Sequence, residues 1–143
     1  ERRNYFMTRA EKANYYHSMC GYNCAQAVVI AFNDILNIDP TLLLKLCEGF
    51  GLGGGTMNGI CGAVNGGMMV IAYLTSDGNV EEGPKTKGMT YRHVKAYQNM
   101  FLEKTNALIC RQLKDPKSST YTPCTSCIDY ACDALDQYLK ELL

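Results

Sequence analysis

The chain has 143 residues, of which 47% are hydrophobic and 20% are charged, and this composition excludes a disordered tail or linker. A domain of this length buries roughly 70% of its unfolded surface, so it folds without a disulfide framework. The 14 Lys and Arg residues balance the 14 Asp and Glu residues, which leaves no net charge to attract nucleic acid or an anionic membrane. The longest apolar run, 68–74, is far shorter than the roughly 20 residues that cross a bilayer, so we expect no membrane insertion.

Apolar residues recur at helical spacing from the beginning of the chain. The first helix is predicted by one apolar face, formed by Phe6, Ala10, Ala13, Tyr16 and Cys20. Gly21 follows as a typical helix stop. The second helix begins at Cys24, because Asn23 and Gln26 form a capping-box pattern, and its apolar face continues to Leu36.

The middle of the chain combines a short helix with a glycine-rich segment. Asp39 and Pro40 form a typical helix start, and the helix they begin extends to Cys47. Nine of the 13 glycines then lie in 49–67, which we predict to be a loop with positive φ angles or close backbone contacts. The apolar segment Gly66–Leu74 is predicted to be a buried helix, since no partner strand is evident.

Polar loops at 75–88 and 115–122 separate the remaining helical patterns. These patterns are a long helix from Tyr91 to Leu102, a restart capped by Asn106 and continuing to Leu113, and a last helix from Thr122-Pro123 to Leu142. No internal repeat or domain boundary is visible. We therefore predict one all-α domain over 1–143, a bundle of about five to six helices with the glycine-rich loop near a cysteine cluster.

Eight cysteines are the main chemical feature: Cys20, Cys24, Cys47, Cys61, Cys110, Cys124, Cys127 and Cys132. An even number suits a secreted disulfide scaffold, but such scaffolds are shorter and richer in loops. The first residues, Glu1-Arg2-Arg3-Asn4, lead into no apolar segment of a secretory signal. We therefore expect a cytoplasmic protein whose thiols are reduced, chemically active or metal-binding.

Five of the cysteines fall where helices are predicted to begin: Cys24, Cys61, Cys110, Cys124 and Cys127. The positive end of the helix dipole and the unpaired N–H groups there favour thiolate over thiol. Cys110 also has Arg111 beside it. Cys47 and Cys132 lie on apolar helical faces and are expected in the core, whereas Cys20 fits either role.

The same cysteines allow a metal site. Cys124-Thr-Ser-Cys127 is a CxxC at a helix start, as in dithiol oxidoreductases, but no strand precedes it as a thioredoxin fold requires. Cys20-x3-Cys24 and the CxxC are each spaced like half of a four-thiolate zinc site, and thiolate sets also hold iron-sulfur clusters. His17 and His93 are isolated and are interpreted as structural.

Four segments together resemble the C_GCAxxG_C_C family of redox-active proteins over nearly the whole chain. They are Gly21-Tyr22-Asn23-Cys24-Ala25-Gln26-Ala27, Gly49-Phe50-Gly51, Cys61-Gly62-Ala63-Val64-Asn65-Gly66 and Cys110-Arg111-Gln112-Leu113, followed by a last cysteine before the terminal helix. Members are bacterial and archaeal proteins with four characteristic cysteines. The resemblance implies that these are Cys24, Cys61, Cys110 and Cys124, with Cys127 as an additional thiol.

Three hypotheses about function follow. The first is a redox protein that uses a cluster of Cys24, Cys61, Cys110, Cys124 and Cys127 for thiol/disulfide exchange or electron transfer. In it Cys61 attacks, Cys24 or Cys110 resolves, and the partner is a redox protein or a small thiol. The second hypothesis makes Cys24, Cys61, Cys110 and Cys124 ligands of zinc or an iron-sulfur cluster. In the third, the protein is a helical interaction module whose cysteines only pack.

Overall fold

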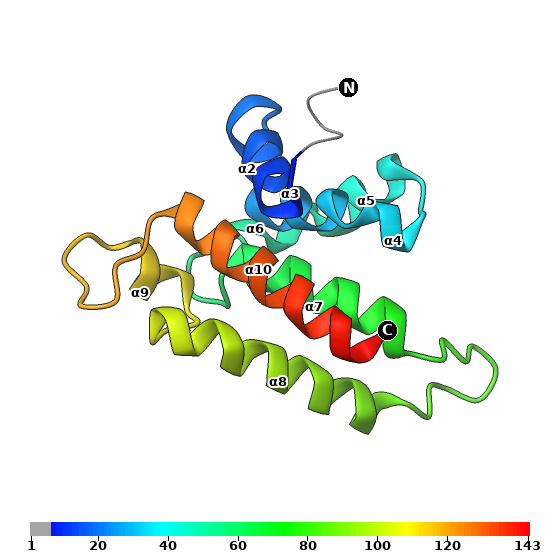
Figure 1. The fold of residues 1–143 in the computed structure, drawn as a ribbon. Coiled ribbons are helices and arrows are strands. Elements are labelled where there is room, and N and C mark those ends of the chain that lie inside the picture. The colour runs from blue at the N-terminus through cyan, green and yellow to red at the C-terminus, as the bar shows by residue number, and fades with distance from the viewer. Residues whose placement is uncertain (1–6) are drawn as a thin grey trace.

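Residues 7–143 of the computed structural model are described, and they form helices joined by loops (Figure 1). The helices are α2 (Arg9–Met19), α3 (Cys24–Ala31), α4 (Asn33–Leu36), α5 (Pro40–Cys47), α6 (Gly51–Gly54), α7 (Gly62–Thr75), α8 (Lys87–Thr105), α9 (Cys110–Lys114) and α10 (Cys124–Leu142), with a 3-10 turn η1 (Glu48–Phe50) after α5. The β-type pairing in this part of the chain is a single isolated bridge between Ile60 and Ile109. The predicted all-α fold class is therefore confirmed. Phe6 of the predicted first helix lies outside the described residues.

Side-chain caps begin α3 and α5 as the sequence predicts. The Asn23 side chain accepts a hydrogen bond from the Gln26 backbone N–H at 2.9 Å, and the Gln26 side chain accepts one from the Asn23 N–H at 2.9 Å. This reciprocal pair satisfies two N–H groups that the helix itself leaves without partners. At the start of α5 the Asp39 side chain accepts a single hydrogen bond from the Thr41 N–H at 3.3 Å.

Three predicted helix boundaries are wrong, whereas α7 begins at Gly62, directly after Cys61, as predicted for that cysteine. The second helix divides at Phe32 into α3 and α4. Asn106 does not start a helix: it adopts a left-handed conformation (φ 60°) and ends α8. Pro123, not Thr122, is the N-cap of α10, so that helix begins directly at Cys124.

The core lies along α7 and α10, the two helices in the middle of Figure 1. α7 packs against α3, α8 and α10, and α10 also packs against α2 and α8. Gly66 allows the α3 backbone close to α7, because a Cβ there would meet the carbonyl oxygen of Ala25 at 2.8 Å. On the other side the fully buried Tyr97 of α8 donates its hydroxyl to the Ala131 carbonyl of α10 at 2.9 Å.

An ion-pair network fastens α2 to two other helices. Arg9 bonds both carboxylate oxygens of Asp34 in α4 and one oxygen of Asp136 in α10, the latter at 2.8 Å. Its guanidinium lies 5.0 Å from the centre of the Phe32 ring. Among the described helices, none combines the length and the apolar character needed to cross a membrane.

Candidate functional site

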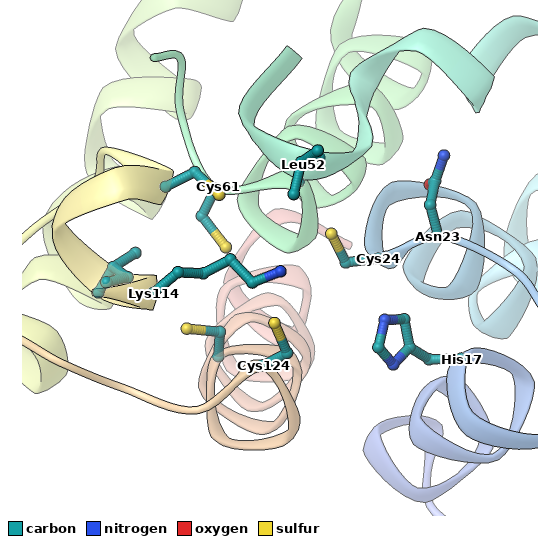
Figure 2. A pocket seen from close by; sticks show the side chains of 11 residues that line it. His17, Asn23, Cys24, Leu52, Cys61, Lys114 and Cys124 are labelled. Carbon is teal, nitrogen blue, oxygen red and sulfur yellow. The ribbon is translucent and has the colours of Figure 1, made fainter. Parts of the chain in front are cut away.

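The starts of four helices meet at one cavity of ≈ 120 Å³ (Figure 2). Each of these helices begins with a cysteine: Cys24 is the first residue of α3, Cys61 the N-cap of α7, Cys110 the first residue of α9 and Cys124 the first residue of α10. Cys127, one turn into α10, lines the same cavity. The remaining lining residues are His17, Asn23, Leu52, Gly62, Leu113 and Lys114. All five cysteines of the predicted cluster are thus brought together.

Backbone hydrogen bonds hold these distant segments side by side. The Cys61 N–H donates to the Leu108 carbonyl at 2.7 Å, and the Cys110 N–H donates to the Gly59 carbonyl at 2.9 Å. This antiparallel pairing, at the bridge described above, places the two cysteines next to each other. The N–H of Thr122 donates to the Leu113 carbonyl at 2.7 Å, which fixes the chain just before α10.

Two asparagines tie the glycine-rich segment to the helices. Asn65 of α7 donates to the carbonyls of Phe50 and Ile60, each at 3.0 Å. Asn23, while capping α3, also donates from its side chain to the Glu48 carbonyl at 2.9 Å. These bonds satisfy loop carbonyls and so position the backbone that faces the sulfurs.

The segment α6 is a left-handed turn at the edge of the cavity. Leu52 (φ 52°, ψ 42°) and Gly53 (φ 60°, ψ 47°) both have left-handed angles, a conformation that costs a residue with a Cβ roughly 1–2 kcal/mol. The turn directs the Leu52 N–H to the sulfur of Cys24. A Cβ at Gly53 would meet the Cβ of Cys110 at 2.5 Å, and one at Gly62 would overlap the Cys24 sulfur. The glycines predicted as a loop therefore allow close contacts between the backbone and the cysteines.

Cys61 has the most reactive surroundings of the cluster. Its side chain is 6% exposed, and its sulfur lies at the N-terminus of α7. A hydrogen bond with the thiol of Cys127 lowers the pKa of Cys61 to about 7, with further help from the N–H groups of Val64 and Ala63 and from the charge of Lys114. Burial opposes this shift, but the hydrogen bonds outweigh it. Cys61 is therefore substantially thiolate near neutral pH.

The neighbouring thiols have the opposite tendency, which corrects the expectation that every helix start favours thiolate. Burial raises the pKa of Cys24, and it raises the pKa of Cys110 to about 11. The interaction with Cys61 raises the pKa of Cys127, which keeps its proton and has both the Cys61 sulfur and, at 3.6 Å, the Thr122 carbonyl oxygen as acceptors. A negative charge on Cys61 also opposes ionisation of Cys110 and Cys127. The resulting arrangement is one thiolate, at Cys61, beside three thiols whose pKa is raised, those of Cys24, Cys110 and Cys127.

Sequence reasoning missed the cation of the site. Figure 2 shows Lys114 extending across the cavity, with its amine among the labelled sulfurs. Arg111, the expected cation, instead bonds the side chain of Asn58 at 3.0 Å and the carbonyl of Thr56 at 3.1 Å. The signal for Lys114 was present, because it lies four residues after Cys110 and so on the same face of α9. His17, which the sequence analysis interprets as structural, also lines the cavity, and burial lowers the pKa of its imidazole.

The three other cysteines lie away from the cavity. Cys47 and Cys132 are buried, as predicted for core residues, and the Cys47 sulfur contacts that of Met69 at 3.6 Å. Cys20 is exposed at the end of α2. Within residues 7–143, no group of three or more His, Cys, Asp or Glu side chains has the arrangement that holds a metal ion.

The fold and the site together describe an all-α protein with a cluster of five cysteines around one cavity. Over residues 22–138 the chain matches the family described as "Putative redox-active protein (C_GCAxxG_C_C)", and it belongs to that family. Comparison with curated proteins gave no match, and comparison with solved structures gave none either.

Proposed function

We propose that the protein is a dithiol redox protein in which Cys61 is the reacting thiolate and Cys127 is the thiol that closes a disulfide with it. The observation that carries this proposal is that both side chains line the same cavity, where each thiol is the largest influence on the pKa of the other. Cys127 therefore replaces Cys24 and Cys110 as the proposed resolving residue, because it affects the ionisation of Cys61 more strongly than they do. Cys61 is the N-cap of α7 and Cys127 lies in α10, so the disulfide would join these two central helices.

The chemistry is a two-electron couple. The thiolate of Cys61 attacks an electrophilic sulfur or oxygen of an oxidant and becomes covalently modified or oxidised. Cys127 then loses its proton and attacks the Cys61 sulfur, which expels the attached group. The two thiols have lost two electrons and two protons to the oxidant, and an external thiol reverses the change. Cys24, Cys110 and Cys124 surround the pair as further thiols that a disulfide can reach by exchange.

The test is a map of disulfides. The reduced protein is treated without oxygen with less than one equivalent of hydrogen peroxide, which is small enough for the cavity, and the digested products are identified by mass spectrometry. We expect the Cys61–Cys127 bond to form first and to be absent from Cys61→Ser. Bonds that instead join other cysteines, with Cys61 and Cys127 still free, would contradict the proposal. Bound metal measured in the same preparation tests the zinc and iron-sulfur hypothesis, which expects stoichiometric metal that is lost in Cys24→Ser.

A further inference from the structure

The position of Cys61 limits what can reach it. Cys61 is only 6% exposed, and it lines a cavity of ≈ 120 Å³. An engineered apolar cavity of about 150 Å³ binds benzene, so a cavity of this size admits an organic molecule of about that size. A disulfide on the surface of a folded protein, or between two peptides, is too bulky to bring its sulfur to Cys61. The oxidant that the cavity fits is a small molecule.

The walls of the cavity indicate the character of that molecule. The polar residues of the lining are His17, Asn23 and Lys114, and the rest of it consists of the weakly polar thiols, the apolar side chains of Leu52 and Leu113, and Gly62. Such walls fit a short alkyl group. The amine of Lys114 points into the same space (Figure 2), where an ammonium group can donate a proton to a leaving group. The cavity thus has the volume of about one small organic molecule. Around it lie the thiolate of Cys61, the proton donor Lys114 and an apolar wall.

We infer that the oxidant of the proposed Cys61–Cys127 couple is a small alkyl hydroperoxide, and that Lys114 protonates the alkoxide that leaves. This inference rests on the proposed function and adds the substrate class to it. A hydroperoxide carries its reactive O–O bond next to a single alkyl group, so both parts fit within the cavity. A hydroperoxide with a bulky substituent does not fit.

The reaction balances with the groups present. The Cys61 thiolate attacks the terminal oxygen of R–O–O–H, the O–O bond breaks, and a sulfenic acid (Cys61–SOH) forms. The departing RO⁻ takes a proton from Lys114 and leaves as the alcohol, and the lysine regains a proton from the Cys127 thiol. The Cys127 thiolate then attacks the Cys61 sulfur and releases hydroxide, which takes up from the solvent the proton that Cys61 had released on ionising and becomes water. The sum is one hydroperoxide reduced to one alcohol and one water, with one disulfide formed. An external dithiol restores the starting state.

The experiment follows the anaerobically reduced protein after addition of tert-butyl hydroperoxide, which has as many heavy atoms as benzene. We expect one alcohol per Cys61–Cys127 disulfide, and a rate far above that of free cysteine at the same thiolate concentration. Cumene hydroperoxide, which carries an aromatic ring, is expected to react more slowly by about tenfold or more, because it exceeds the cavity. In Cys127→Ser the reaction is expected to stop at the sulfenic acid of Cys61, which dimedone traps.

Lys114 is tested with a matched pair of variants. Both Lys114→Met and Lys114→Arg remove the proton donor, and we expect each to slow tert-butyl hydroperoxide reduction by about 10²-fold. Arginine keeps the positive charge, so alkylation of Cys61 by iodoacetamide is expected to remain near the wild-type rate in Lys114→Arg. An unchanged hydroperoxide rate in both variants would overturn the role of Lys114.

The outcomes separate this inference from the proposed function. If hydrogen peroxide forms the Cys61–Cys127 disulfide but tert-butyl hydroperoxide reacts no faster than with free cysteine, the substrate class is wrong and the dithiol couple stands. If cumene and tert-butyl hydroperoxides react equally fast, the cavity does not select the oxidant, and the inference fails in the same way. If neither hydrogen peroxide nor an alkyl hydroperoxide links the two cysteines, both proposals fail.

Discussion

Replacing Cys127 by Ala tests the cause of the unusual acidity of Cys61. A pKa lowered from 9.0 to about 7 corresponds to about 3 kcal/mol in favour of the thiolate. The hydrogen bond from Cys127 is the largest contribution to that shift. Hydrogen bonds to charged groups contribute about 1.5–3 kcal/mol, and a thiol is a weak donor, so the lower value applies. We therefore expect Cys127→Ala to raise the pKa of Cys61 by about one unit, to about 8.

The assay is the rate of Cys61 alkylation by iodoacetamide as a function of pH, followed on its peptide by mass spectrometry. At pH 7 the thiolate fraction should fall from about one half to about one tenth, so the rate should fall about fivefold. Cys127→Ser is the matched control, because its hydroxyl still donates to the Cys61 sulfur and should keep the pKa low. An alkylation midpoint in Cys127→Ala that equals the wild-type midpoint would refute the hydrogen-bond explanation.

The same shift predicts the pH dependence of stability. Because the folded-state pKa of Cys61 lies below the value of 9.0 for an unperturbed thiol, the thiolate stabilises the reduced fold fully above that pH. This contribution is lost as the pH falls through about 7. The urea midpoint of wild type should therefore rise relative to that of Cys61→Ser between these two pH values. A constant difference across the range would contradict the assignment.

Three further substitutions test the packing around the site and the fold. Gly62→Ala should destabilise the protein by about 1–3 kcal/mol in urea unfolding, since the added Cβ would overlap the Cys24 sulfur. Gly88→Ala in α8 is the control: the nearest atom to its Cβ would be 3.9 Å away, so this substitution should be neutral or stabilising. Arg9→Met should lower the free energy of unfolding by about 1 kcal/mol, because it removes the ion pair with Asp34. Arg9 lowers the pKa of Asp34 below 3.8, so this loss should be present above pH 3.8 and should disappear as the pH falls through the lowered pKa. A loss of stability that is unchanged in acid would exclude the ion pair as its source. Leu52→Gly should speed the labelling of the cavity thiols by bulky maleimides. The Leu52 side chain lines the cavity and is also 42% exposed, so it lies between the cavity and the solvent. Equal labelling rates in the variant and the wild type would show that Leu52 does not restrict entry.

Local chemistry made much of the fold predictable. Asn23 and Gln26 cap α3 by hydrogen bonds within four residues, so no distant contact is needed to place that helix start. The left-handed Asn106 shows the limit of this reasoning. An asparagine before a helical pattern resembles an N-cap, but the same residue type tolerates left-handed angles and ends helices. The choice between these roles depends on the packing of α8, which the local sequence does not specify.

The candidate site was predictable as a set of residues but not as an arrangement. A cysteine at a predicted helix start is visible in the sequence, and the family resemblance grouped the same positions. The ionisation of each thiol was not visible, because it depends on how deeply the sulfur is buried and which donor faces it. Cys110 illustrates this: it begins a helix, yet burial raises its pKa to about 11. Lys114 was missed because its amine reaches the cavity only after α9 is docked.

The amino-acid sequence alone determined the helical architecture and the placing of cysteines at the beginnings of helices, since caps, apolar periodicity and glycines act over a few residues. Only the tertiary structure decided that Cys61 meets Cys127 and that Lys114 enters the same cavity. The physical reason is the distance along the chain over which each kind of interaction acts. Local signals act along the chain, whereas the contact between two sulfurs more than sixty residues apart depends on the packing of α7 against α10 and on the backbone pairing at Ile60 and Ile109.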